Sequence, residues 1–369
     1  MKPLHLQARL NGLDTLRACA ILLVLMYHYM VFVSKQPSFG FLSEIGWIGV
    51  DLFFVLSGYL IGNQIFSELK KTSDFSIKRF YARRFLRTLP NFYVVLAIYF
   101  LFPIAAGGNP VTPLWKFLTF TQNLELKPGS AFSHAWSLSI EEQFYVALPL
   151  VALLSLAWIK SLRTMWLILI TAMIGAACMR YAMWTNVGSD GTKYYVTIYY
   201  STWTRFDELL PGVILALLKN YHSNTWSQLQ KRPHVSLIFG AALSGLAMFL
   251  FTHYSFDDEV GFLWFTTTFG YTLLSCGFAL LCLSALSPTS YLNRISIPGA
   301  STLAVWSYAW YLIHKPVMNA LIKPFKEIGL SATTWPGIAA MFGVSLVAAY
   351  VLYTVVETPF MRLRERYFP

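Results

Sequence analysis

The chain has 369 residues, of which 56% are hydrophobic and only 12% are charged, a balance that excludes an ordinary soluble protein. The formal net charge is +11, but the basic residues are distributed over many short segments between apolar blocks, which argues against a nucleic-acid-binding surface. Length and composition therefore indicate an integral membrane protein.

Ten apolar blocks follow one another along the chain, each roughly 20 residues long, which is the length of a membrane-spanning helix. They are centred near Val24, Leu56, Ala97, Ala147, Ile170, Val213, Leu243, Leu274, Leu312 and Val344. The second and sixth blocks are the weakest, because they carry charged residues such as Asp51 and Arg205. We predict an all-α, polytopic membrane protein of about ten transmembrane helices.

The distribution of Lys and Arg predicts the orientation of these helices. With the N-terminus placed in the cytoplasm, 18 of the 28 basic residues fall on the cytoplasmic side and seven fall outside, Arg180 among them. The remaining three lie within predicted helices: Arg17, Arg205 and Lys315. An excess of basic residues in cytoplasmic loops is the positive-inside pattern. We therefore expect both termini in the cytoplasm.

The first apolar block carries two ionisable side chains, Arg17 and His28. A cation at the centre of a membrane helix costs roughly 2.5–3.5 kcal/mol on insertion scales, so such residues usually face a polar cavity or a partner. Eleven residues separate the two, which places them about 20° apart on one helix face and about 16 Å apart in depth. Alone, Arg17 could be a cytoplasmic anchor and His28 a buried structural histidine, but their shared face favours function.

Asp51 lies in the second block, on one stripe with Gly58 and Gly62. This glycine spacing allows another helix to approach closely, which would bring Asp51 against a neighbouring helix. A carboxylate inside a membrane needs a cation or a hydrogen-bond donor, and we expect His28 or Arg17 to be that partner. The alternative is that Asp51 caps the helix at the membrane surface.

Basic residues crowd the segment between the second and third blocks. Arg79, Arg83 and Arg87 recur at helical spacing, and Arg84 adjoins them. Such a composition alone suits cytoplasmic anchoring. Paired guanidinium groups also match the geometry of phosphate, so this segment is a candidate binding site for the phosphates of a cytoplasmic ligand.

The fourth block opens with polar side chains. His134, Glu141 and Tyr145 lie on one stripe that enters the membrane, and Glu142 adjoins Glu141. Two consecutive glutamates cannot both face lipid without a large cost. At least one of them should therefore line a cavity, orient a histidine or bind a hydroxyl-bearing substrate, with the other residues of the stripe in a substrate-binding or supporting role.

Two later blocks also carry ionisable residues. In the sixth block, Arg205 and Glu208 have the spacing of a helical ion pair, and an internal structural pair is the favoured interpretation. In the ninth block, His314 lies deep in an apolar segment. His314 is therefore the main rival to His28 as the functional histidine.

Seven segments follow one another along the sequence in this order: LDTLRACAILLVLMYH, GWIGVDLFFVLSGYLIG, YARRFLRTLP, HAWSLSIEEQFYVALP, TWTRFDELLPG, SYAWYLIHKPV and VVETPF. On these segments the chain resembles the membrane-bound acyltransferase family 3, the bacterial sugar O-acyltransferase family. The resemblance covers essentially the whole chain and implies a single integral-membrane acyltransferase domain over residues 1–369, with ten helices. We do not expect the SGNH-type extension that some members carry.

The resemblance implies an enzyme that moves an acyl group, usually acetyl, from cytoplasmic acyl-CoA to a hydroxyl of a cell-envelope carbohydrate or a lipid-linked acceptor. It also implies a place in the bacterial cytoplasmic (inner) membrane. The family's R-x(10)-H pattern falls on Arg17 and His28, and its R-x-x-R pattern on Arg84 and Arg87. The sequence has no HExxH or CxxC motif, and we expect no metal.

Within this mechanism His28 is the expected general base or acyl carrier, because a neutral imidazole can accept a hydroxyl proton at neutral pH. Asp51 or Glu141 would fix its tautomer, and the arginines of the two family patterns would hold the phosphates of acyl-CoA. The rival hypothesis is a transporter or flippase of envelope precursors, since intramembrane ionisable residues also mark substrate paths. The acceptor, the acyl chain length, the oligomeric state and the choice between direct transfer and an acyl-histidine stay open.

Overall fold

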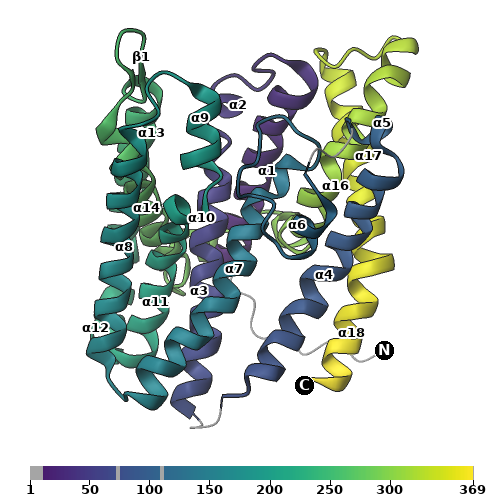
Figure 1. Ribbon diagram of the computed structural model, residues 1–369. Helices are drawn as coiled ribbons and strands as arrows, with labels where there is room; N and C mark the ends of the chain where they lie inside the picture. The colour runs from purple at the N-terminus through teal and green to yellow at the C-terminus, as the bar shows by residue number, and fades with distance from the viewer. Residues whose placement is uncertain (1–10, 72–74, 109–111, 369) are drawn as a thin grey trace.

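The computed structural model describes residues 11–71, 75–108 and 112–368, and within these ranges the protein is a bundle of long helices with one short hairpin (Figure 1). The first half contains α1 (Asn11–His28), η1 (Tyr29–Ser34), α2 (Phe41–Ile45), α3 (Ile48–Lys71), α4 (Ile77–Leu101), α5 (Pro103–Ala106), α6 (Leu114–Leu118), η2 (Ser133–Ala135), α7 (Trp136–Ala152), η3 (Leu153–Trp158) and α8 (Leu162–Trp184).

The second half begins with α9 (Gly191–Tyr194), η4 (Tyr195–Tyr199), α10 (Thr202–Arg205), η5 (Phe206–Leu209), α11 (Leu210–Tyr221), α12 (Ser223–Gln230) and α13 (Pro233–His253). The antiparallel strands β1 (Phe256–Asp257) and β2 (Gly261–Phe262) form the hairpin, with Phe256 opposite Phe262. The chain continues with η6 (Thr266–Gly270), α14 (Tyr271–Ala285), α15 (Tyr291–Arg294), α16 (Ala300–Glu327), α17 (Trp335–Leu352), η7 (Tyr353–Glu357) and α18 (Thr358–Tyr367).

Seven helical segments of the described residues are long and apolar enough to cross a membrane: Asn11–Ser34, Ile48–Lys71, Ser133–Trp158, Leu162–Trp184, Pro233–His253, Thr266–Ala285 and Trp335–Tyr367. The other three apolar blocks predicted from the sequence centre on α4, α11 and α16. The all-α, polytopic class is confirmed, while ten spans and cytoplasmic termini stay predictions. The first two basic residues of the topology count, Lys2 and Arg9, lie outside the described residues.

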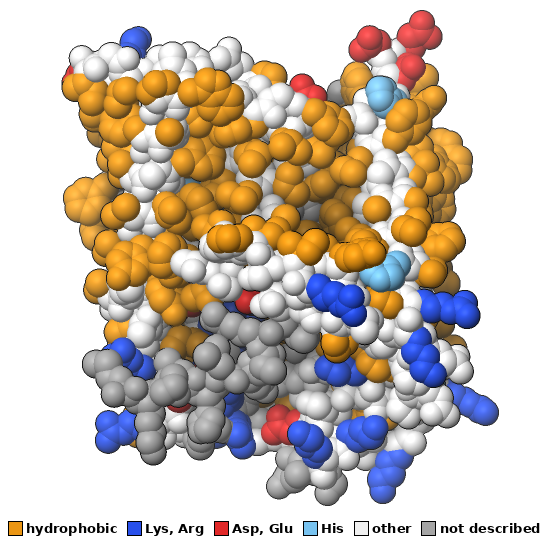
Figure 2. Space-filling view, turned by 180° about the vertical axis from the view of Figure 1, so that it is seen from behind, with side chains coloured by type: hydrophobic (Ala, Val, Ile, Leu, Met, Phe, Trp, Pro, Cys, Tyr) orange, Lys and Arg blue, Asp and Glu red, His pale blue; other side chains and the backbone are white. Residues whose placement is uncertain are grey.

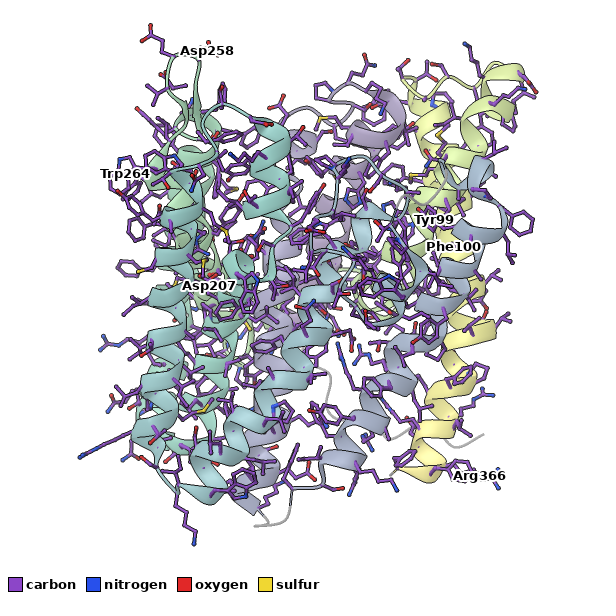
Figure 3. The ribbon with its side chains drawn as sticks, viewed as in Figure 1. Tyr99, Phe100, Asp207, Asp258, Trp264 and Arg366 are labelled. Carbon is purple, nitrogen blue, oxygen red and sulfur yellow. The ribbon has the colours of Figure 1, made fainter. Side chains whose placement is uncertain are left out.

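The two ends of the bundle differ in charge. Asp258 marks the tip of the hairpin at one end, and Arg366 lies at the opposite end, in α18 (Figure 3). A broad band of hydrophobic side chains covers the middle and the hairpin side of the surface, whereas Lys and Arg gather toward the other side (Figure 2). We call these the hairpin end (β1 and β2) and the basic end (Lys71, Arg79, Arg83, Arg364 and Arg366). The positive-inside rule predicts that the basic end faces the cytoplasm.

A side-chain cap fixes where the basic segment becomes helical. Ser76 accepts a hydrogen bond from the backbone N–H of Arg79, at 3.3 Å, and so satisfies a donor that the first turn of α4 leaves unpaired. From this start Arg79, Arg83 and Arg87 follow at one-turn intervals. The helical basic face predicted from the sequence is therefore confirmed.

Glycines allow α3 and α11 to touch backbone to backbone. A methyl group added at Gly58 would collide with the carbonyl oxygen of Leu209, and one added at Gly212 would collide with that of Val55. Small residues permit this close approach between membrane helices. The approach predicted at Gly58 is confirmed, and it brings α3, which carries Asp51, against η5.

Candidate active site

Three buried histidines from three segments meet inside the bundle. His28 ends α1, His134 lies in η2, and His314 lies in α16. The ring centroid of His314 is 5.0 Å from that of His28 and 5.1 Å from that of His134, and the remaining pair is 5.9 Å apart. The two histidines that the sequence presented as rivals are thus neighbours. Within the described ranges, no group of His, Cys, Asp and Glu side chains is arranged to hold a metal ion.

A hydrogen bond between His28 and His314 determines which nitrogen of His28 is free. Nδ1 of His28 lies 2.8 Å from Nε2 of His314, and Nδ1 of His314 lies 3.1 Å from the carbonyl oxygen of Trp310. Because a carbonyl only accepts, a neutral His314 carries its proton on Nδ1 and accepts at Nε2. His28 therefore donates from Nδ1, and its Nε2 keeps a lone pair that can accept a proton.

Exposure separates the three histidines. His28 keeps 8% of its surface exposed, compared with 2% for His134 and none for His314. His28 is therefore the most exposed of the three, and His314 is placed to orient it. His134 donates or accepts at Nε2 with the carbonyl oxygen of Leu312, at 3.2 Å.

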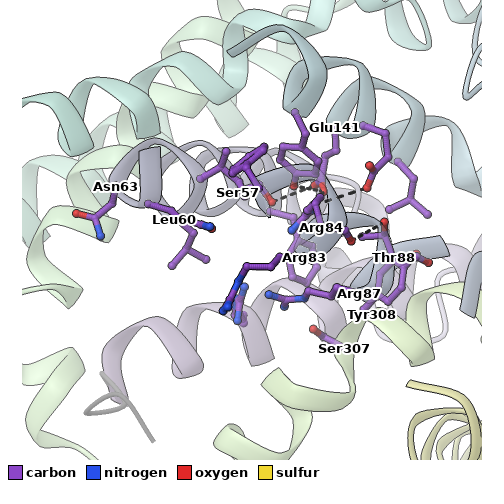
Figure 4. A pocket seen from close by; sticks show the side chains of 18 of the residues that line it. Ser57, Leu60, Asn63, Arg83, Arg84, Arg87, Thr88, Glu141, Ser307 and Tyr308 are labelled. Atoms are coloured by element: carbon purple, nitrogen blue, oxygen red, sulfur yellow. Dashed lines mark hydrogen bonds and ion pairs between the residues drawn. The ribbon is translucent and has the colours of Figure 1, made fainter. Parts of the chain in front are cut away.

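A cavity of about 990 Å³ runs inward from the basic end. Its volume is at the upper end of the range for small-molecule and cofactor sites, roughly 300–1,000 Å³. Seven basic side chains line it: Arg17, Lys71, Arg79, Arg83, Arg84, Arg87 and Arg364. Only three acidic side chains do so, namely Glu68, Glu141 and Glu142. The lining therefore carries an excess of four positive charges, and Figure 4 shows Arg83, Arg84 and Arg87 grouped beside this space.

The polar stripe of α7 holds one of these arginines. The guanidinium of Arg84 lies 3.9 Å from Glu141 and 3.8 Å from Glu142, and it covers the ring of Tyr145 at 3.6 Å. The hydroxyls of Tyr145 and Ser57 donate to Glu141 at 2.7 Å and 3.2 Å. The prediction that a glutamate of this stripe lines a cavity is confirmed. However, the carboxylates of Glu141 and Glu142 hold Arg84 rather than a histidine.

Tyr311 joins the cavity to the histidines. Its side chain lines the cavity, and its hydroxyl lies 2.8 Å from that of Ser137 and donates to the carbonyl oxygen of His134. The ring centroid of Tyr311 is 6.3 Å from that of His28 and 5.6 Å from that of His134. The cavity that begins among the arginines thus ends one side chain away from the histidine cluster. Arg17 lines the same cavity from the helix that carries His28.

Asp51 does not contact His28, and the expectation that it does is wrong. Asp51 is fully buried, and its Oδ1 accepts a hydrogen bond from Nη2 of Arg205 at 2.9 Å. Arg205 also pairs with Glu208, as its spacing predicted. Arg205 ends α10, directly before η5, and the close contact between α3 and η5 brings it to Asp51. Neither Arg17 nor His28 is therefore needed to neutralise Asp51. The imidazole of His28 is instead held by another histidine.

A second buried ion pair, between Arg180 and Asp207, was not predicted from the sequence. Arg180 binds Asp207 through two hydrogen bonds, of 2.7 Å and 3.0 Å, and both side chains are fully buried. The topology count placed Arg180 in an outside loop, which is wrong because it lies in α8. A signal was present in the sequence: the sixth block holds two acidic residues and a single arginine, so one carboxylate needed a cation from elsewhere.

Comparison with models of protein families identifies the family of this chain. A family model described as an acyltransferase domain matches residues 10–354. The chain belongs to this acyltransferase family. The matched range includes all three histidines, the basic face of α4 and the polar stripe of α7, so the recognised domain contains the histidine cluster and the whole cavity lining except Arg364.

Three relatives illustrate the similarity. The peptidoglycan O-acetyltransferase OatA of Listeria monocytogenes is 28% identical over 94% of this chain and 55% of its own length. The putative peptidoglycan O-acetyltransferase YrhL of Bacillus subtilis is 29% identical over 94% of this chain and 54% of its own length. A putative O-acetyltransferase of Staphylococcus aureus is 26% identical, over 95% and 57% respectively. The chain thus spans about half the length of these relatives. No solved structure matches it significantly.

Proposed function

We propose that the protein is a membrane O-acyltransferase that moves an acetyl group from acetyl-CoA to a hydroxyl of a cell-envelope carbohydrate. The observation that carries this proposal is the arginine-lined cavity that includes Tyr311, whose ring lies 6.3 Å from that of His28. Membership of an acyltransferase family and the O-acetyltransferase names of the relatives support the same class of reaction.

The charge of the cavity suits the donor. Acetyl-CoA carries several phosphates at one end and its thioester at the end of a flexible arm. Guanidinium groups bind phosphate through paired, charge-assisted hydrogen bonds, and Arg17, Arg83 and Arg87 line the cavity. The arm would extend from these arginines toward Tyr311. Arg17 and His28 are eleven residues apart on α1, so it would span about 16 Å.

The free Nε2 of His28 suits the chemical step. In direct transfer it accepts the proton of the acceptor hydroxyl while the hydroxyl oxygen attacks the thioester carbonyl. The ester C–O bond forms, the C–S bond breaks, and the proton passes to the departing thiolate, which gives an acetyl ester and free CoA. General-base assistance of this kind contributes about 10²–10⁴-fold to a rate. The hydrogen bond to His314 keeps His28 in the tautomer that this step requires.

The charge asymmetry of the bundle suits a transfer across the bacterial cytoplasmic membrane. The cavity begins among basic-end residues such as Lys71, Arg79 and Arg364, which the positive-inside rule assigns to the cytoplasm. Acetyl-CoA is a cytoplasmic metabolite, whereas an envelope carbohydrate lies on the other side. The donor would thus enter at the basic end and the acceptor at the hairpin end.

The proposal is tested by product formation. The protein in lipid nanodiscs is incubated with acetyl-CoA and isolated bacterial envelope glycan, and mass spectrometry detects base-labile acetyl esters on the glycan. Wild type and His253→Ala, which alters an exposed histidine on α13, should both form the ester, and His28→Ala should not. If wild type binds acetyl-CoA but acetylates nothing, or if it does not bind acetyl-CoA, the proposal fails.

A further inference from the structure

A second cavity lies on the other side of the bundle from the arginines. It has a volume of about 240 Å³ and lies among α2, η4, β2 and the end of α13, close to the hairpin end. Eight of its thirteen lining residues are aromatic, and five of these are tyrosines. No lysine, arginine or histidine is among the lining residues, whose single charged group is the carboxylate of Glu44. This second cavity therefore offers aromatic rings, hydroxyls and one carboxylate, whereas the first cavity offers mainly cations.

The buried ion pair of Arg205 and Asp51 supports the inner wall of this second cavity, which we call the aromatic pocket. Tyr199 and Tyr271 line it, and the guanidinium of Arg205 lies over their rings at 4.7 Å and 4.0 Å. The Tyr271 hydroxyl is also hydrogen-bonded to that of Tyr194, at 3.0 Å. Because Asp51 holds Arg205 in place, this carboxylate supports the pocket wall instead of the catalytic histidine.

The outer part of the pocket presents more accessible rings. Tyr195 and Trp47 are half-buried lining residues, and Trp47 is fixed edge-to-face against Phe251, with centroids 4.8 Å apart. Glu44, which lies nearby on α2, is exposed. Aromatic faces with phenol hydroxyls and one carboxylate at the rim thus surround a space that water can enter.

His28 lies near one lining residue of each cavity. Tyr27 lines the aromatic pocket, and its ring centroid is 5.9 Å from that of His28. On the other side, Tyr311 lines the arginine cavity, with its centroid 6.3 Å from that of His28. A ligand in the aromatic pocket would thus contact Tyr27, which precedes His28 in the chain, and a ligand in the arginine cavity would contact Tyr311.

We propose that the aromatic pocket is the acceptor site and that it binds a single uncharged sugar ring. This inference rests on the proposed acyltransferase function. The C–H face of a pyranose can lie on the electron-rich face of Tyr195 or Trp47, while its hydroxyls bond to tyrosine hydroxyls and Glu44. The volume is below the roughly 300–1,000 Å³ of sites for larger ligands, so one ring fits rather than several.

The absence of cations from the lining specifies the acceptor further. A phosphate or carboxylate on the bound ring would meet Glu44 and no basic group among the lining residues, and burial of an unpaired charge is costly. Any phosphate of a lipid-linked acceptor would therefore stay outside this pocket. An aromatic pocket with a carboxylate can also attract a quaternary ammonium group, and the test includes that ligand.

Saturation-transfer-difference NMR on the full protein in nanodiscs tests the proposal without any turnover. The probes are the tetrasaccharide of β-1,4-linked N-acetylglucosamine and, separately, tetramethylammonium. We expect saturation of the sugar C–H protons in wild type and in Tyr254→Ala, whose exposed tyrosine lies outside the pocket. The signal should fall at least fivefold in Tyr195→Ala and weaken in Glu44→Gln.

Two results would overturn the inference: equal sugar signals in wild type and Tyr195→Ala, or saturation of tetramethylammonium without saturation of the sugar. Binding of acetyl-CoA, measured by calorimetry on the same samples, separates this inference from the proposed function. Acetyl-CoA binding without a pocket-dependent sugar signal would refute the acceptor site alone, whereas failure of acetyl-CoA to bind wild type would refute the acyltransferase.

Discussion

Removal of the Arg205 guanidinium should destabilise the protein more than any single change in its carboxylate partners. Arg205 is fully buried and is bonded to Asp51 and Glu208, so one cation serves two carboxylates. Loss of one partner of a buried ion pair costs about 3–5 kcal/mol. Arg205→Met leaves two buried carboxylates without their cation and also removes its contacts with the rings of Tyr199 and Tyr271. We therefore expect a loss at the upper end of that range.

The single substitution Asp51→Asn should be much milder, because Arg205 and Glu208 then remain as a neutral pair. The triple variant Arg205→Met, Asp51→Asn, Glu208→Gln removes all three charges together and should recover most of the stability that Arg205→Met loses. This recovery is the signature of an uncompensated charge, since lost packing alone would not be restored.

The assay is the apparent melting temperature of the detergent-solubilised protein, followed by fluorescence-detected size-exclusion chromatography. The expected order is wild type, Asp51→Asn, the triple variant and Arg205→Met, from most to least stable. A wild-type melting temperature for Arg205→Met would show that Arg205 does not stabilise the two buried carboxylates. Loss of CoA release in Asp51→Asn at an unchanged melting temperature would return Asp51 to a catalytic role.

Three further predictions follow from the site and the fold. His314→Ala removes the group that holds His28 and should lower the rate of CoA release about 10–100-fold, with unchanged calorimetric affinity for acetyl-CoA; an unchanged rate would contradict the tautomer argument. Arg87→Gln removes a charge-assisted contact worth about 1.5–3 kcal/mol and should weaken acetyl-CoA binding about tenfold or more. The control Arg366→Gln changes an exposed arginine outside the cavity and should bind acetyl-CoA as wild type does. Equal affinities of the two variants would refute the phosphate site. Gly58→Ala places a methyl group against a backbone carbonyl and should lower the melting temperature, unlike Gly343→Ala, which meets open space; equal melting temperatures would show that α3 and α11 are not closely packed.

Local periodicity was sufficient to predict the features that one helix carries by itself. Apolar runs of membrane length located the helices, and helical spacing placed Arg83 and Arg87 on one face of α4. The interval between Arg17 and His28 likewise predicted a shared face; Arg17 lines the arginine cavity, and the ring of His28 lies 6.3 Å from that of Tyr311, which also lines it. Such patterns depend only on the geometry of a single helix.

Side-chain contacts between distant segments could not be predicted from local sequence patterns. Asp51 and Arg205 are 154 residues apart, and His28 and His314 are 286 residues apart, so nothing in their local sequence links them. Sequence order suggested His28 or Arg17 as the nearest partner for Asp51, but the close contact of Gly58 on α3 with Leu209 of η5 brings Arg205 to it instead. The aromatic pocket was missed for the same reason, because its tyrosines come from several segments and each alone is an ordinary membrane-helix residue.

We propose that His28 performs the chemistry on a donor bound in the arginine cavity. The most direct test measures CoA release at saturating acetyl-CoA for wild type and His28→Ala, with acetyl-CoA affinity determined by calorimetry on the same nanodisc samples. We expect equal affinity and a release rate that falls about 10²–10⁴-fold in the variant. A His28→Ala protein that binds acetyl-CoA and releases CoA at the wild-type rate would contradict this proposal.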